Sequence, residues 1–176
     1  MANLTPQEID TLVGRLKKHP YLCTAVRGGT VSGVTVTGAT ETVYLNPLSG
    51  PPTAAPDTET TDVTLYETLA DVQARFLNRN DVTVTITTRN IDAGMAMSSK
   101  IKKGDNLLST TLEYVLTLVP ITGESEPVIL FAHAYPQAGL TFNPGENGDP
   151  STVQITFTCK ADATTGVPFV YSTPSA

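Results

Sequence analysis

The stretch Val128-Ile129-Leu130-Phe131-Ala132-His133-Ala134-Tyr135 is an apolar run with β-branched and aromatic residues, as expected of a buried strand. A turn rich in Pro, Gly and Asn follows, from Thr141-Phe142-Asn143-Pro144-Gly145 to Pro150. Apolar and Thr side chains then alternate from Val153 to Thr158, which is the pattern of a half-buried strand. Together these segments predict a long hairpin, followed by a polar turn and a short apolar strand that ends at Tyr171.

The composition favours a mainly β protein. A chain of 176 residues with 40% apolar residues is long enough for one domain that buries roughly 70% of the surface of its unfolded chain. Threonine is abundant, Trp is absent and only 6% of residues are aromatic, which indicates strands with one solvated, hydroxyl-rich face. We therefore expect a single domain over residues 1–176.

The net charge of -6 argues against sequence-independent binding of nucleic acid, because such binding depends on Lys and Arg that neutralise phosphates. An acidic surface is compatible with DNA that slides past without being held. The amino-terminal residues show no secretory hydrophobic region, and no stretch approaches the ~18 apolar residues of a membrane span. The sequence thus predicts a protein that stays or assembles in the cytoplasm.

The first sixty residues predict a helix, two strands and a loop. Thr5 and Glu8 have the spacing of a capping box, and the apolar stripe that follows predicts a helix over residues 6–18. Residues 21–45 change to strand periodicity, with two strands joined near Gly38. Four prolines then mark residues 46–61 as a long loop, which we interpret as either a disordered linker or a binding loop.

The middle of the chain contains one ambiguous segment and one clear strand. Residues 63–77 fit a helical stripe and also an alternating strand, and the good helix formers within them favour the helix. Residues 81–88 alternate Val or Ile with Thr and predict a strand. A short helix or turn over residues 91–103 and a strand over residues 107–119 complete this part.

Residues with catalytic chemistry are few. His19 follows two lysines at the end of the predicted first helix, and His133 lies between alanines in an apolar strand, where a hydrogen-bonded structural role is expected. Cys23 and Cys159 have no metal-ligand spacing and are interpreted as buried free thiols, with a disulfide as the alternative. We expect no enzyme activity, no cofactor and no metal site.

The closing pattern resembles the end of the major tail tube subunits of tailed bacteriophages. The resemblance rests on F-N-P-G-E at residues 142–146, V-Q-I-T-F-T at 153–158 and A-D-A-T-T-G-V-P-F at 161–169, and more loosely on the order of elements from Asp81. It implies a β-sandwich or β-barrel-like tail tube fold with one or two short α-helices. It also implies hexameric rings that stack into a tube in the virion, through which the genome passes without specific binding.

The resemblance suggests partners and contact residues as well. Partners would be other copies of the chain, the tape measure protein, and tail terminator or baseplate proteins. Long loops join the rings in such tubes, so the Pro-rich loop would supply contacts through Leu48, Pro51, Pro52 and Pro56. A hydroxyl-rich strand face, Thr83, Thr85 and Thr87, would face the lumen. The sequence leaves open a secreted adhesin or pilin-like sandwich, a carbohydrate-binding or hydrolytic β domain, and a capsid decoration protein.

Overall fold

The computed structural model describes residues 21–64, 72–120, 127–146 and 148–172. The helix predicted over residues 6–18 lies outside these ranges. The described residues form a mainly β fold with one α-helix and one short 3-10 helix. The elements are β1 (Tyr21–Arg27), β2 (Thr30–Ser32), β3 (Thr35–Thr37), β4 (Glu41–Tyr44), β5 (Thr53–Thr64), β6 (Val72–Thr88), α2 (Ile91–Ser98), η1 (Thr110–Leu112), β7 (Tyr114–Pro120), β8 (Val128–Pro136), β9 (Thr141–Asn143), β10 (Thr152–Cys159) and β11 (Val170–Ser172).

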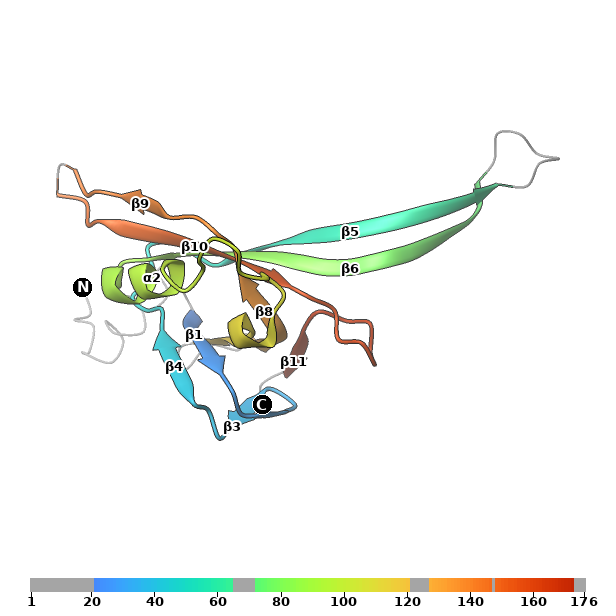
Figure 1. Cartoon of the computed structure of the whole chain (residues 1–176), viewed down its shortest axis with the longest axis horizontal. Helices are drawn as coiled ribbons and strands as arrows, with labels where there is room; N and C mark the ends of the chain where they lie inside the picture. The colour runs from blue at the N-terminus through green and yellow to red at the C-terminus, as the bar shows by residue number, and fades with distance from the viewer. Residues whose placement is uncertain (1–20, 65–71, 121–126, 147, 173–176) are drawn as a thin grey trace, which may run out of the picture.

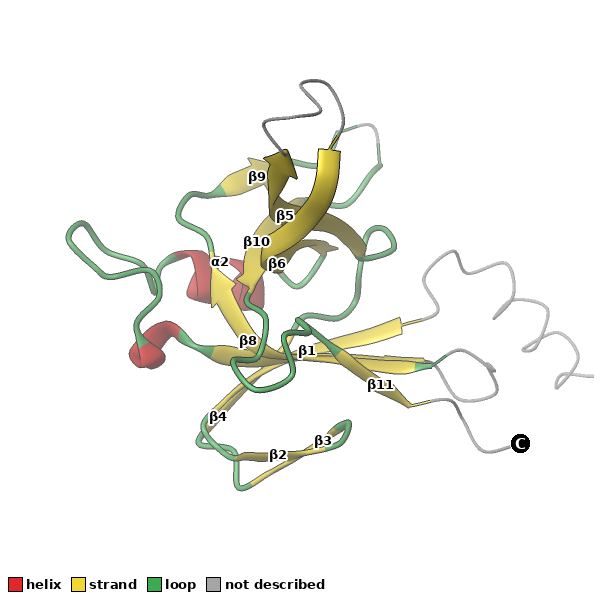
Figure 2. Cartoon of the chain, turned by 90° about the vertical axis from the view of Figure 1, so that its right-hand side faces the viewer, coloured by secondary structure: helices red, strands yellow, loops and turns green. Residues whose placement is uncertain are grey.

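Nine strands form one antiparallel sheet that folds over on itself. Its main path runs β4-β1-β7-β8-β10-β6-β5, with β11 paired to β8 and β9 paired to β10, while β2 and β3 form a separate hairpin. The sheet bends at β8, so that β4, β1, β7 and β11 lie in one layer and β10, β6 and β9 lie above it (Figures 1 and 2). The result is a β-sandwich-like fold, in agreement with the sequence-based prediction.

The core lies between the two layers and draws on strands that are distant in the sequence. Cys23, Leu116 and Phe131 come from the lower layer, and Ile86 and Phe157 come from the upper one; all five belong to one buried cluster. Alternation in β6 produces this arrangement, because Val84, Ile86 and Thr88 are buried while the residues between them are partly exposed. The prediction of a strand at residues 81–88 is therefore confirmed.

Helix α2 packs on β10 at one end of the core (Figure 1). The Asn90 side chain caps its first turn by accepting a hydrogen bond from the Ala93 backbone N–H at 3.2 Å. Gly94 permits a close approach, since a Cβ placed there would lie 2.6 Å from the Val153 Cβ. The short helix predicted within residues 91–103 is confirmed, and it ends at Ser98.

The predicted carboxyl-terminal hairpin is also confirmed. Strands β8 and β10 pair antiparallel with Phe157 opposite Pro136, and β9 pairs with the start of β10. The short strand that follows the hairpin is β11, which pairs with the first half of β8. The two strands predicted for residues 21–45 are instead four short ones, because the small hairpin β2–β3 is inserted between β1 and β4.

Two predictions for residues 46–77 are wrong. The Pro-rich segment 46–61 is a loop only up to Pro52, and from Thr53 it is strand β5. The helix predicted over residues 63–77 is replaced at both described ends by strand, since β5 continues to Thr64 and β6 begins at Val72. Pairing between these two long strands overrides the helix propensity of their side chains. Pro56 is tolerated because β5 is an edge strand.

Candidate functional site

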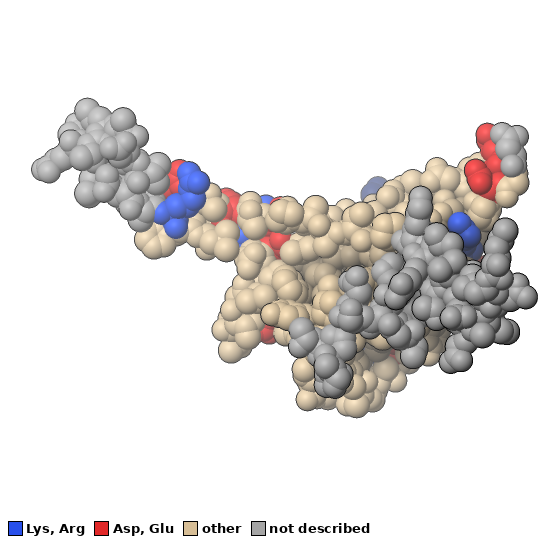
Figure 3. Space-filling model, turned by 180° about the vertical axis from the view of Figure 1, so that it is seen from behind, with Lys and Arg blue, Asp and Glu red and all other residues tan. Residues whose placement is uncertain are grey.

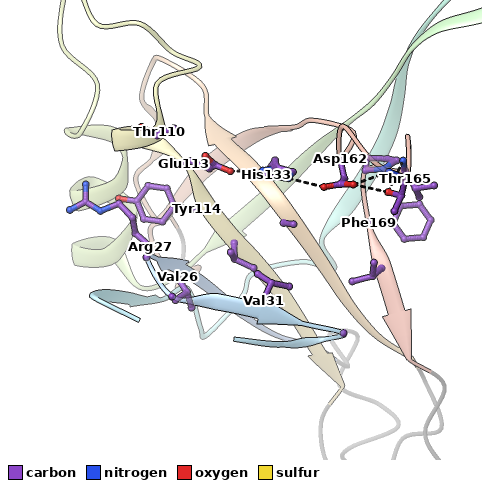
Figure 4. Close-up of a pocket in the computed structure, with 18 residues that line it drawn as sticks. Val26, Arg27, Val31, Thr110, Glu113, Tyr114, His133, Asp162, Thr165 and Phe169 are labelled. Carbon is purple, nitrogen blue, oxygen red and sulfur yellow. Dashed lines mark hydrogen bonds and ion pairs between the residues drawn. The ribbon is translucent and has the colours of Figure 1, made fainter. Parts of the chain in front are cut away.

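The described residues form three candidate functional surfaces: a pocket, an exposed arm and a threonine-rich face. The pocket has a volume of about 610 Å³ and lies between the β2–β3 hairpin, β7, β8 and the turn that precedes β11 (Figure 4). Val26, Val31 and Val115 line its apolar side. Phe169 adds an aromatic wall, with its ring centroid 6.1 Å from that of Phe131.

Three ionisable side chains meet at the polar side of this pocket. The Nδ1 of His133 makes a short hydrogen bond with Oε1 of Glu113, and its Nε2 lies 3.5 Å from Oδ2 of Asp162. Burial lowers the pKa of His133, but its hydrogen bonds to Glu113 and Asp162 outweigh that effect, so the pKa is raised. The expectation that His133 is a hydrogen-bonded histidine is confirmed.

The chemistry available to His133 is limited by its neighbours. Both ring nitrogens face carboxylates, and no hydroxyl or thiol within the described residues makes a hydrogen bond with the imidazole. Cys23 and Cys159 are both free and buried, as predicted. Burial raises the pKa of both thiols, that of Cys159 to about 12, so the reactive thiolate is not populated at neutral pH. His19 lies outside the described residues.

The arm is the part of the β5–β6 hairpin that leaves the sandwich, residues 58–64 and 72–80. It extends far beyond the rest of the molecule in Figure 1. The side chains of residues 75–79 are all exposed, and Phe76 and Leu77 keep 59% and 55% of their surface open to solvent. Sequence reasoning missed this site, because the helical interpretation of residues 63–77 placed Phe76 on an apolar helical stripe.

Opposite charges pair across the arm. Arg75 makes a bidentate contact with Asp62, at 2.6 Å from Nε to Oδ1 and 3.0 Å from Nη2 to Oδ2. Closer to the body, Nη2 of Arg79 lies 2.8 Å from Oδ1 of Asp57. Both blue and red side chains are visible on the arm in Figure 3. Because the four side chains keep between 38% and 63% of their surface open to solvent, the two ion pairs contribute little to stability.

The predicted contact residues of the Pro-rich segment divide into two groups. Leu48 is only 6% exposed, pairs with Thr88 in an isolated bridge and belongs to the core cluster, so its assignment to contacts between rings is wrong. Pro52 is partly buried, whereas Pro51 and Pro56 are exposed. Of the four, only these last two are fully available to another molecule.

The predicted threonine face exists as a continuous surface. Thr83, Thr85 and Thr87 are partly exposed on the side of β6 opposite to Val84 and Ile86. Strand pairing extends the face, because Thr158 lies opposite Thr83, and both Thr156 and Thr53 lie opposite Thr85. The result is a hydroxyl-rich strip across three neighbouring strands.

Comparison with models of known protein families and with curated proteins gave no match to this chain. Across the described ranges, no group of three or more His, Cys, Asp or Glu side chains is placed to hold a metal ion. No helix in the same ranges is both long enough and apolar enough to cross a membrane. The function of the protein is therefore inferred from the three surfaces.

Proposed function

We propose that this protein is a structural subunit that assembles with copies of itself into rings, and that the rings stack into the tail tube of a bacteriophage, the conduit for genome delivery. The observation that carries the proposal is the arm. It is a long two-stranded ribbon with exposed apolar side chains, and an isolated ribbon of this kind is marginally stable in water. Phe76 and Leu77 are consecutive strand residues and point to opposite faces of the ribbon, so copies packed on its two faces would remove this apolar surface from water.

Free strand edges support the same proposal. In the described part of the chain, β4 and β5 end the main path of the sheet and each pairs on one side only. Tyr44, on β4, is 67% exposed. Exposed strand edges such as these offer unpaired backbone N–H and C=O groups to other chains. A ring of copies that pair edge to edge satisfies these groups, and a closed ring leaves no free edge for uncontrolled growth.

The threonine face supports a role in genome passage. Its side chains are uncharged, and the whole chain carries a net charge of -6. A surface of hydroxyl groups in an acidic protein offers DNA phosphates few cations to bind, so DNA would move along it with little friction. We therefore assign Thr83, Thr85 and Thr87 to the lumen, and the resemblance to tail tubes assigns the ends of the tube to tape measure, terminator or baseplate proteins.

Truncation of the arm tests the proposal. The variant replaces residues 59–79 with Asn-Gly, which joins Thr58 to Asn80, two residues that already pair across the hairpin. We expect the full-length protein to form rings or tubes in negative-stain electron microscopy at high concentration. The truncated protein should remain monomeric in light scattering and keep a cooperative unfolding transition, because its sandwich is intact. A full-length protein that stays strictly monomeric and is absent from virions would contradict the proposal.

A double substitution serves as the matched control for the truncation. Phe76→Ser with Leu77→Ser keeps the length of the arm and removes its exposed apolar side chains. If the arm acts through apolar contacts, this variant loses assembly as the truncated one does. If it acts through backbone pairing, the variant assembles and only the truncation fails. Assembly of both variants would exclude the arm from the interface.

The lumen assignment has its own test. Changing Thr83, Thr85 and Thr87 to Lys adds three positive charges to a partly exposed face, so we expect the fold to persist. Phage carrying this variant should show slow or incomplete genome ejection, because the channel would then hold phosphates along its length. The same phage with normal infectivity would place the lumen on another face.

A further inference from the structure

The turn between β10 and β11 is built around one carboxylate. Oδ1 of Asp162 accepts hydrogen bonds from the backbone N–H groups of Thr164 and Thr165, at 3.0 and 2.9 Å, and from the Thr165 hydroxyl at 3.2 Å. The backbone of Asp162 closes the turn by accepting from Gly166 at 2.8 Å and donating to Val167 at 3.1 Å. These bonds link Asp162 to the residues from Thr164 to Val167, and we call residues 160–168 the latch turn.

The latch turn also holds the root of the arm. The Asn80 side chain donates to the Gly166 carbonyl at 2.9 Å. Asp81 accepts from the Lys160 ammonium at 2.6 Å and from the Ala161 backbone N–H at 3.1 Å. Asp81 is only 3% exposed, so these bonds are shielded from water. Asn80 and Asp81 are the residues at which β6 passes from the arm into the sandwich, and both depend on the position of the latch turn.

On its other side the latch turn is tied to the sheet through His133. The oxygen of Asp162 that does not bind the turn faces Nε2 of His133, and Nδ1 of the same ring binds Glu113, just before β7 (Figure 4). We propose that Glu113, His133 and Asp162 form a proton-operated latch, which fixes the latch turn and the arm root when His133 is protonated and releases Asp162 when it is neutral.

The latch depends on how many N–H donors the His133 ring carries. An imidazolium has two N–H groups and satisfies two carboxylates, whereas a neutral imidazole has one N–H and presents a lone pair to the other carboxylate. The contact to Asp162 spans 3.5 Å, at the long end of the hydrogen-bond range, so the proposal places the remaining proton of the neutral ring on Nδ1, toward Glu113, and the lone pair of Nε2 toward Asp162. Loss of the proton therefore breaks the contact to the latch turn first.

The direction of the pH effect follows from the two pKa values. The raised pKa of His133 means that the latch is complete below the ordinary histidine value of about 6.5 and is lost as pH rises through the higher value of the folded state. The backbone N–H groups of Thr165 and Thr164 lower the pKa of Asp162, which keeps it ionised into the acidic range. The latch is thus closed in mildly acidic solution and opens toward alkaline pH.

Other charged groups near the latch do not replace His133. Tyr135 on β8 stays neutral, because burial and the charge of Glu113 raise its pKa. Lys160 is engaged by Asp81, and Arg27 at the pocket rim contacts Glu41 at 3.2 Å and the Thr111 carbonyl at 2.9 Å. His133 is the group on which the two carboxylates converge.

Hydrogen exchange and an NMR titration test the latch on the soluble full-length protein. We expect His133 to titrate with a pKa above about 6.5. Because the pKa of His133 is raised in the folded protein, backbone amides of the latch turn and of Asn80 should lose protection between pH 6 and pH 8.5 after correction for intrinsic exchange. Amides in β10 and β7 serve as the internal reference and should not change.

Two variants make the result decisive. His133→Gln should give a latch turn with weak protection that does not depend on pH, and its missing signal identifies His133 in spectra that also contain His19. Glu113→Gln removes one carboxylate and should lower the pKa of His133 while the ring remains. A His133 pKa at or below 6.5, or a pH-dependent loss that persists in His133→Gln, would overturn the latch.

The consequence for assembly rests on the proposed function. If the arm joins copies of the chain, a closed latch presents it at a fixed angle, and assembly should be faster at pH 6 than at pH 8.5 in the native protein and independent of pH in His133→Gln. The exchange measurement does not require assembly. A confirmed latch in a protein that never assembles would therefore refute the tube proposal alone, and assembly without the exchange effect would refute the latch alone.

Discussion

The two halves of β6 share a strand and a partner, β5, yet they have opposite surroundings. From Val84 to Thr88 every second side chain enters the core, whereas from Arg75 to Arg79 all side chains are exposed. Pairing with β5 runs through the arm and on as far as Thr85, with register shifts in the arm, whereas Val82 to Thr88 also pair with β10. Backbone pairing alone thus carries the ribbon outward, and side-chain burial decides which half belongs to the folded body.

The largest effect on the free energy of unfolding is expected in the buried half of β6. Ile86→Ala should lower the free energy of unfolding by about 2–5 kcal/mol, because Ile86 is fully buried and its truncation leaves a cavity. Leu77→Ala on the same strand should change it by less than about 0.5 kcal/mol, since Leu77 is largely exposed. Urea denaturation followed by circular dichroism measures both. Equal losses in the two variants would mean that the arm is packed against something in the free subunit.

The boundary between the halves gives the second prediction. Asp81 and Asp57 lie directly opposite one another on β6 and β5, but only Asp81 is buried. Asp81→Asn should cost about 1–3 kcal/mol, because it removes the charge that holds Lys160 and weakens the bond to Ala161. Partial exposure of Lys160 keeps the loss below that of a fully buried ion pair. Asp57→Asn is the control, and thermal unfolding should show almost no change for it.

A third prediction concerns the helix that closes the core at the end of the buried half. Gly94→Ala adds a Cβ at 2.6 Å from that of Val153, and the strain should exceed the gain of about 1 kcal/mol in helix propensity, for a net loss of about 0.5–2 kcal/mol. The double variant with Val153→Ala tests the cause by a mutant cycle. Val153→Ala should cost less in the Gly94→Ala variant than in the native protein; simple additivity would show that the helix adjusts without touching β10.

The same contrast explains which parts of the structure could be predicted from sequence. Val84 and Ile86 alternate with threonines, so the burial pattern of residues 81–88 is visible in the sequence, and residues 153–158 show the same alternation. Residues 128–135 are recognisable instead as a continuous apolar run. The arm has no such period, since neither face of it meets a core. The good helix formers of residues 63–77 favoured a helix, and the prolines of residues 46–61 favoured a loop, because propensity scales contain no information about a partner strand.

The residues of the candidate site also differ in whether the sequence could place them. The threonine face follows from alternation within one strand, and the sequence was sufficient to place Thr83, Thr85 and Thr87 on it. Leu48 was misassigned because its neighbours are prolines, while its burial depends on a bridge to Thr88, which is distant in the sequence. The latch could not be predicted from the sequence either, because Glu113, His133 and Asp162 come from three segments that only the folded sheet brings together.

The smallest effect is expected from the ion pair on the arm. The hydrogen bonds from Arg75 lower the pKa of Asp62, so Arg75→Gln should raise that pKa toward its ordinary value of 3.8, as measured by NMR titration of the carboxyl group. A depressed carboxyl pKa adds stability above the unfolded value and loses it as pH falls through the folded value, so any contribution of the pair is present at neutral pH. Because both side chains are exposed, the unfolding transition of the body should not move, and amide protection in the arm should fall only a few-fold. Complete loss of protection in residues 58–62, with the body intact, would show instead that this side-chain pair, and not the ladder to β6, holds the arm together.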